Sequence, residues 1–100
     1  IEALYDARHN AVRVETFRPG NRRWTIYTNI PLTLNDGDQF GAQALSNGQV
    51  KIFKNGVLVG TVTLNTADRA FFNNKGGCIG LWFIKAGDAA FDDFGGGNIP

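Results

Sequence analysis

Short runs in which apolar and polar residues alternate cover most of this chain. In residues 11–17, valine or threonine stands at every second position between charged residues, which is the period of a strand with one buried face. Residues 78–84 are apolar on both faces, which favours a central strand covered on both sides. Such patterns predict strands over residues 1–5, 11–17, 23–28, 39–45, 50–54, 57–64, 78–84 and 89–94, about eight in all.

Turn residues separate these runs. Pro19-Gly20 fits the centre of a type II turn, because proline sets one dihedral angle and glycine supplies the positive φ. Asn55-Gly56 lies between two apolar runs and predicts a tight β-hairpin. Residues 65–77 are irregular, with room for one helical turn over 67–72 capped by Thr66. Because no helical pattern is long enough for parallel crossovers, we expect an all-β fold, an antiparallel β-sandwich.

Length and composition limit the class of protein. A chain of 100 residues allows one domain. The hydrophobic fraction of 43% is typical of globular proteins and argues against disorder. We assign residues 1–95 to a single β-sandwich and residues 96–100 to a flexible glycine-rich tail. No apolar run approaches the roughly 20 residues of a membrane span, so none is expected.

The net charge and the cysteine content limit which partners the chain is expected to bind. The formal net charge is +1, whereas nucleic-acid binding needs a clustered basic stripe, so no nucleic-acid partner is expected. Arg18, Arg22 and Arg23 do cluster, but around a turn, where we interpret them as a solvated loop tip. The single Cys78 cannot form an internal disulfide, and its apolar neighbours predict a buried thiol. A bond to a cysteine of another chain is the alternative.

Four segments carry a resemblance to a known family. They read GDQFGAQA over residues 37–44, VKIFKNG over 50–56, GCIGLWF over 77–83 and DDFGGG over 92–97. In this order and spacing they resemble the concanavalin A-like lectin/glucanase superfamily, and more closely the laminin G-like jelly-roll domains of bacterial extracellular proteins. The resemblance implies a jelly roll, an extracellular or cell-surface location, and a role in carbohydrate binding or adhesion.

The chain is shorter than the domains it resembles. They are roughly twice as long, so the resemblance covers only a C-terminal half, apparently a half-length domain. A half sandwich leaves sheet edges and apolar faces uncovered, which invites pairing with another chain. We therefore expect a second copy or a complementary fragment to supply the missing surface, with a self-sufficient small sandwich as the alternative.

Catalysis is not expected. The superfamily includes glycoside hydrolases, whose retaining members need two carboxyl groups about 5 Å apart. Their enzyme branch carries these groups in a Glu-x-Asp-x-x-Glu pattern, and neither Glu2 nor Glu15 lies in such a pattern. Asp92 and Asp93 are adjacent and point to opposite faces of a strand. The only histidine, His9, lies in a polar turn and is expected to be solvated.

Candidate ligand-binding residues come from the carbohydrate hypothesis. Carbohydrate modules stack sugar rings on exposed aromatic side chains, which supply apolar area with defined geometry. Trp82 is the first candidate, on a concave sheet face, although its position between core residues of the family pattern favours the alternative of burial in the core. Phe53 is the aromatic residue most expected to be exposed, and it suits a sugar or a protein contact. The full predicted set is Trp82, Asn73, Asn74, Trp24 and Phe53.

A calcium ion is the one cofactor considered. Relatives of the family often bind calcium at a loop rim, and such cations need several converging oxygen ligands. Asp36 and Asp38 flank Gly37 in one predicted turn and are the candidate ligands. The same three residues also fit an ordinary hairpin turn.

Three hypotheses of function follow. The first is a non-enzymatic, extracellular carbohydrate-binding or adhesion-type module whose partner is a glycan or another protein. The second is a self-associating structural subunit, a dimer or a filament, that uses exposed sheet edges. The third is a C-terminal fragment of a glycoside hydrolase-like protein, in which sequence outside this chain supplies the carboxylates.

Overall fold

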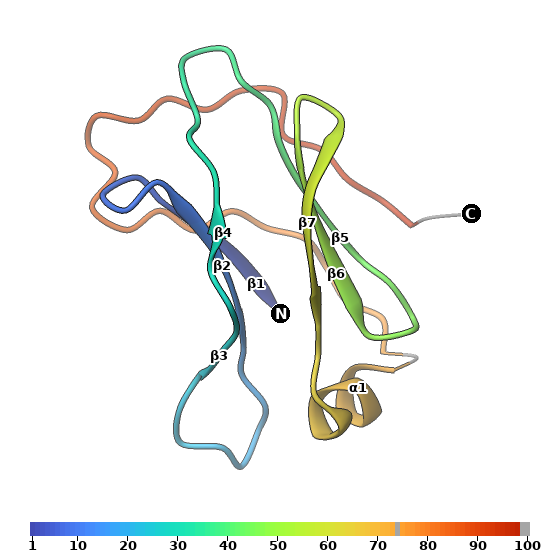
Figure 1. Ribbon diagram of the computed structural model, residues 1–100. Coiled ribbons are helices and arrows are strands. Elements are labelled where there is room, and N and C mark those ends of the chain that lie inside the picture. The colour runs from blue at the N-terminus through green and yellow to red at the C-terminus, as the bar shows by residue number, and fades with distance from the viewer. Residues whose placement is uncertain (74, 99–100) are drawn as a thin grey trace.

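Two antiparallel sheets face each other across the core (Figure 1). They are seen in a computed structural model, which describes residues 1–73 and 75–98. The first sheet contains β1 (Glu2–Asp6), β2 (Ala11–Thr16), β3 (Thr25–Ile26) and β4 (Ile30–Pro31). The second contains β5 (Phe40–Ala44), β6 (Gln49–Lys54) and β7 (Val57–Thr63), and β7 leads into α1 (Thr66–Phe72). The predicted antiparallel β-sandwich is therefore confirmed.

Strand register places the apolar positions on the inner faces. In the first sheet β2 is central: β1 pairs with one edge of it, and the short strands β3 and β4 pair with the other. In the second sheet β6 is central between β5 and β7. Directly opposite residues of antiparallel strands share a face, so each alternating pattern delivers one row of side chains to the core. The buried apolar side chains are Val12, Val14, Ile30, Leu32, Val50, Ile52, Val62 and Leu64.

The two predicted tight turns are present. Asn55 and Gly56 have φ values of 51° and 77°, the two positive angles of a type I′ hairpin turn. Gly20 has a φ of 91°, and the Asn21 amide donates to the Arg18 carbonyl at 3.0 Å across the Pro19-Gly20 turn. The chemistry of these short turns is local, so the sequence predicts them well.

Several element boundaries differ from the prediction. The strand predicted over 23–28 is reduced to β3, and Ile30–Pro31 forms the additional strand β4. Proline is tolerated there because β4 pairs only with β2. The cap of α1 is Asn65 rather than Thr66, and the Asn65 side chain accepts a hydrogen bond from the Asp68 amide.

The two strands predicted over residues 78–84 and 89–94 are absent from the described structure. Here the chain, which we call the C-terminal arm (residues 78–94), follows an irregular path outside both sheets (Figure 1). It folds back on itself: the Ala89 amide donates to the Ala86 carbonyl at 3.1 Å. The Phe83 and Phe91 rings also lie 4.5 Å apart between centroids. A strand needs a neighbour that supplies backbone hydrogen bonds, and neither segment has one among the described residues.

The two sheets approach each other closely at Gly60 of β7. A Cβ atom built on Gly60 would lie 2.8 Å from Ile30 Cδ1 and 2.9 Å from Ile30 Cγ2. Such distances are too short for carbon atoms, so the absence of a side chain at this position lets Ile30 enter the core. A glycine inside a strand often marks such a close approach.

We expect Gly60→Ala to destabilise the fold by about 2 kcal/mol, because an added methyl group overpacks the core against Ile30. Urea unfolding measures this change. Gly41→Ala is the matched control in the same sheet: its Cβ would meet only Phe53 Cβ, at an ordinary 3.7 Å. Equal stability of the two variants would show that the sheets do not approach closely at Gly60.

Candidate functional site

A buried carboxylate joins the helix to the first sheet. Asp68 lies in the first turn of α1 and its side chain is fully buried. Its oxygens accept hydrogen bonds from Thr16 Oγ1 at 2.5 Å, Tyr27 Oη at 2.5 Å and Arg18 Nε at 2.7 Å. Thr16 ends β2, Arg18 lies in the connection from β2 to β3, and Tyr27 directly follows β3. One side chain of α1 therefore holds three points of the first sheet and its loop.

The helix start belongs to the same network. Asn65 Oδ1 accepts a hydrogen bond from the Asp68 amide at 2.8 Å, which caps α1. The Asn65 amide in turn donates to Tyr27 Oη at 3.0 Å. The Tyr27 hydroxyl thus donates to one residue of the helix turn and accepts from another, and this fixes where α1 begins.

The protonation states follow from this environment. Burial acts to raise the pKa of Asp68, but hydrogen bonds from Thr16, Tyr27 and Arg18 outweigh it and hold that pKa below its ordinary value of 3.8. Burial, and then the bond to Asp68, raise the pKa of Tyr27 above its ordinary 10.0. At neutral pH the Asp68 carboxylate is charged and the Tyr27 phenol is neutral, so each hydrogen-bond donor in the network has an acceptor. The arrangement suits a structural role.

The network positions the loop between β2 and β3, which we call the aromatic loop (residues 17–24). Its two ends carry Phe17 and Trp24, whose ring centroids lie 5.4 Å apart at an interplanar angle of 44°. Phe17 is 44% exposed and Trp24 is 42% exposed, so the pair presents apolar surface to solvent. The loop and α1 lie at the same end of the sandwich, the lower end in Figure 1.

The aromatic loop is also basic. Arg22 and Arg23 are exposed and directly precede Trp24. Residues 16–29 contain three arginines and no acidic residue. Arg18 is paired with Asp68, whereas Arg22 and Arg23 form no ion pair within residues 1–73 and 75–98. The predicted solvated loop tip is confirmed for Arg22 and Arg23, whereas Arg18 is half-buried against Asp68. The structure adds the Phe17–Trp24 aromatic pair to this loop.

Trp82 does not lie on a sheet face. It belongs to the C-terminal arm and is 64% exposed, so the alternative of a core tryptophan is also wrong. The arm's other large apolar residues are likewise exposed, namely Ile79, Leu81, Phe83, Ile84, Phe91 and Phe94. Cys78 is exposed rather than buried, because the strand in which burial was expected does not form in the described structure.

The remaining predicted ligand-binding residues are separated from one another. Phe53 is half-buried in β6, where it pairs across the sheet with Gly41 and Leu58. Asn73 is exposed at the C-terminal end of α1, and its amide donates to the Arg69 carbonyl. Asn74 lies outside the described residues. Of the predicted set, Trp24 is the one that the structure places in a defined aromatic pair.

The predicted calcium ligands lie in a hydrogen-bonded turn. Asp38 accepts hydrogen bonds from the Asn35 amide at 2.7 Å and from Asn55 Nδ2 at 2.9 Å, and Lys54 Nζ lies 3.3 Å away. The bond from Asn55 is the main cause that lowers the Asp38 pKa. Asp36 is exposed. Within residues 1–73 and 75–98 no three His, Cys, Asp or Glu side chains gather as a metal site, so calcium binding stays a prediction.

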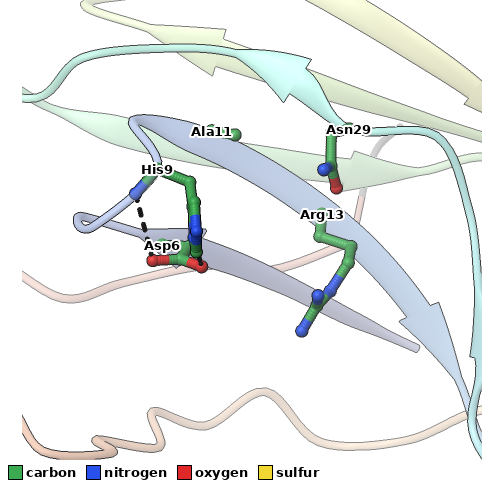
Figure 2. Close-up of a pocket in the computed structure, with 5 residues that line it drawn as sticks. All are labelled: Asp6, His9, Ala11, Arg13 and Asn29. Carbon is green, nitrogen blue, oxygen red and sulfur yellow. Dashed lines mark hydrogen bonds and ion pairs between the residues drawn. The ribbon is translucent and has the colours of Figure 1, made fainter.

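A shallow pocket of about 180 Å³ opens on the outer face of the first sheet, lined by Asp6, His9, Ala11, Arg13 and Asn29 (Figure 2). His9 Nδ1 lies 2.7 Å from Asp6 Oδ2, and this hydrogen bond is the main cause that lowers the Asp6 pKa. The His9 side chain is exposed, as predicted. The Asp6–His9 hydrogen bond spans the β1–β2 turn and stabilises it.

Two carboxylates face each other beside this pocket. Glu2 and Glu15 are direct partners across β1 and β2, a position in which Cβ atoms lie about 5 Å apart. Burial, and then the charge of Glu15, raise the Glu2 pKa. Arg13 Nε lies 2.6 Å from Glu15 Oε1 and compensates the two acids. Neither carboxylate lines this pocket.

Sequence reasoning missed Asp68 and Phe17. The partners of Asp68 lie 41 to 52 residues away in the sequence, so no local pattern joins them. One local signal was available: Asn65 followed three residues later by an acidic residue is a helix-start pattern. That signal locates the cap correctly at Asn65, although it does not predict the burial of Asp68.

Comparison with known proteins gives no relative. No protein-family model, no curated protein and no solved structure matches this chain. In the described part of the chain, no helix has the length and apolar character needed to cross a membrane.

We expect Asp68→Asn to destabilise the fold by about 3 kcal/mol, because it leaves the buried hydroxyls and Arg18 without their anionic partner. The Asp68 pKa is lower in the folded than in the unfolded chain, so its contribution is present above pH 3.8 and is lost as the pH falls through the folded value. Urea unfolding as a function of pH should therefore show a shallower acid loss in the variant. The control is Asp88→Asn, which changes an exposed carboxylate. If the stability of Asp68→Asn fell with acid as steeply as that of the wild type, the prediction would be contradicted.

Proposed function

We propose that this protein is a non-enzymatic binding module that holds carbohydrate on the Phe17–Trp24 pair. The observation that carries the proposal is this exposed aromatic pair, with ring centroids 5.4 Å apart. Aromatic rings offer flat apolar surface to the C–H groups of a sugar ring, while nearby polar groups orient the hydroxyls. Isolated exposed aromatic residues are common, but a paired set on an ordered loop is a stronger sign of recognition.

The anchoring of the aromatic loop supports the proposal. Arg18 at one end is bonded to Asp68, and the Pro19-Gly20 turn restricts the tip. Ligand binding costs less ordering when the binding groups are held in place beforehand. Trp82, the residue that the sequence favoured, lies on the irregular C-terminal arm and lacks this preorganisation. The proposal includes the extracellular or cell-surface location that the resemblance to lectin-like jelly rolls implies.

We expect the protein to be retarded in affinity gels that contain polysaccharide, and Trp24→Ala to weaken the binding about tenfold by removing the larger ring of the pair. The matched control is Trp82→Ala, which removes the same residue type from the C-terminal arm and should leave the affinity unchanged. Thermal unfolding of each variant confirms that the fold is intact. Failure of a broad polysaccharide panel to retard the wild-type chain would reject the proposal.

Self-association through the C-terminal arm is a second candidate function. Its seven large apolar side chains are 49–64% exposed, which is unusual for one continuous segment of a soluble chain. Residues 78–100 carry one lysine and three aspartates, whereas residues 1–77 carry nine basic and six acidic residues. The arm is therefore acidic and the rest of the chain basic, and this complementarity favours a second copy as the partner.

We expect a concentration-dependent dimer in sedimentation velocity experiments at micromolar concentration. Phe83→Glu should shift it to monomer, because the charge opposes burial of the arm. Val57→Glu is the matched control: Val57 is 65% exposed but lies on β7, outside the arm. A wild-type chain that is monomeric throughout the concentration range would exclude this candidate and favour a complementary fragment or no partner.

A further inference from the structure

We propose that the ligand of the aromatic loop is an acidic polysaccharide, one whose sugar rings carry carboxylate groups. The inference rests on the proposed function and adds the chemical class of the sugar. A neutral glycan needs only the Phe17–Trp24 surface. The observation that points further is that Arg22 and Arg23, the two residues before Trp24 in the chain, are both exposed.

Charge at the site is fixed by the Asp68 network. The aromatic loop holds three arginines, and the carboxylate of Asp68 neutralises only Arg18, at 2.7 Å. Arg22 and Arg23 keep their charge, and the nearest residues in sequence, 16–29, contain no acid to compensate them. Asp68 therefore neutralises Arg18, the residue that anchors the loop. The guanidinium groups of Arg22 and Arg23, the two residues before Trp24, are not neutralised by it.

Guanidinium groups fit carboxylates well. Arginine presents planar N–H donors that can make two parallel hydrogen bonds to one carboxylate, and the group remains charged at any physiological pH. Next to Trp24, a sugar ring that stacks on the indole would place a carboxylate on its rim within reach of Arg22 or Arg23. The two interactions are complementary, because stacking binds the ring face and arginine binds the ring substituent.

The same chemistry argues for a polysaccharide rather than a nucleic acid. A strand of nucleic acid needs a basic groove that neutralises several successive phosphates. Here the net charge of the whole chain is +1, and only two arginines accompany one aromatic pair. A site of this size suits one or two acidic sugar residues.

Affinity electrophoresis with a matched pair of polymers tests the proposal. Polygalacturonate carries free carboxylates, whereas fully methyl-esterified pectin has the same sugar with its charge removed. We expect tighter binding to polygalacturonate, a loss of about fivefold in that affinity for Arg22→Gln/Arg23→Gln, and no loss toward the ester. Added salt should weaken the binding to polygalacturonate only.

The control variant Arg8→Gln/Lys51→Gln removes the same net charge from other parts of the surface and should bind like wild type. Equal binding of both polymers, unaffected by the arginine substitutions, would overturn the acidic-sugar assignment and leave carbohydrate binding intact. Binding to neither polymer nor to any other polysaccharide would reject both proposals. The protein could instead bind dextran sulfate or single-stranded DNA more tightly than polygalacturonate, in a way that depends on Arg22 and Arg23. That result would overturn the assignment of carboxylate sugars in favour of the tighter-binding ligand class.

Discussion

The ionised side chain of Asp68 is the constraint on which the lower end of this sandwich depends. A buried carboxylate is tolerated only when hydrogen-bond donors surround it. Here Thr16, Arg18 and Tyr27 supply these donors. These donors lie on the first sheet, whereas Asp68 follows the second. Satisfying one carboxylate therefore fixes α1 against the opposite sheet and determines the start of the aromatic loop. Fold and candidate site share this interaction.

The strands that the sequence predicted correctly are those whose signals are local. Alternation in residues 11–17 and the Asn55-Gly56 turn specify β2 and the β6–β7 hairpin, because side-chain direction and turn geometry are decided by neighbours in the chain. The arm shows the opposite case. Residues 78–84 form an apolar run typical of a central strand. A strand also requires a partner, and an apolar run carries no information about whether one is present.

The candidate site was predictable only in part. Trp24 could be named as a candidate from its residue type, because carbohydrate modules use aromatic side chains. Its pairing with Phe17 depends on how far the loop closes, which the bond between Arg18 and Asp68 controls from 50 residues away. The same long-range bond separates one arginine of the cluster from the other two. Sequence inspection treats the three as equivalent, whereas the fold gives them different roles.

The polar residues of the C-terminal arm have a consequence for solubility. Segments of about six or seven apolar residues without charge stack readily into cross-β fibrils. Gly80 and Lys85 confine one apolar run to residues 81–84, and Asp92-Asp93 interrupt the next. Charges and glycines placed in this way oppose fibril growth, as gatekeeper residues do beside unavoidable hydrophobic strands. The composition of the arm thus acts against amyloid-like stacking even though its large apolar side chains are exposed.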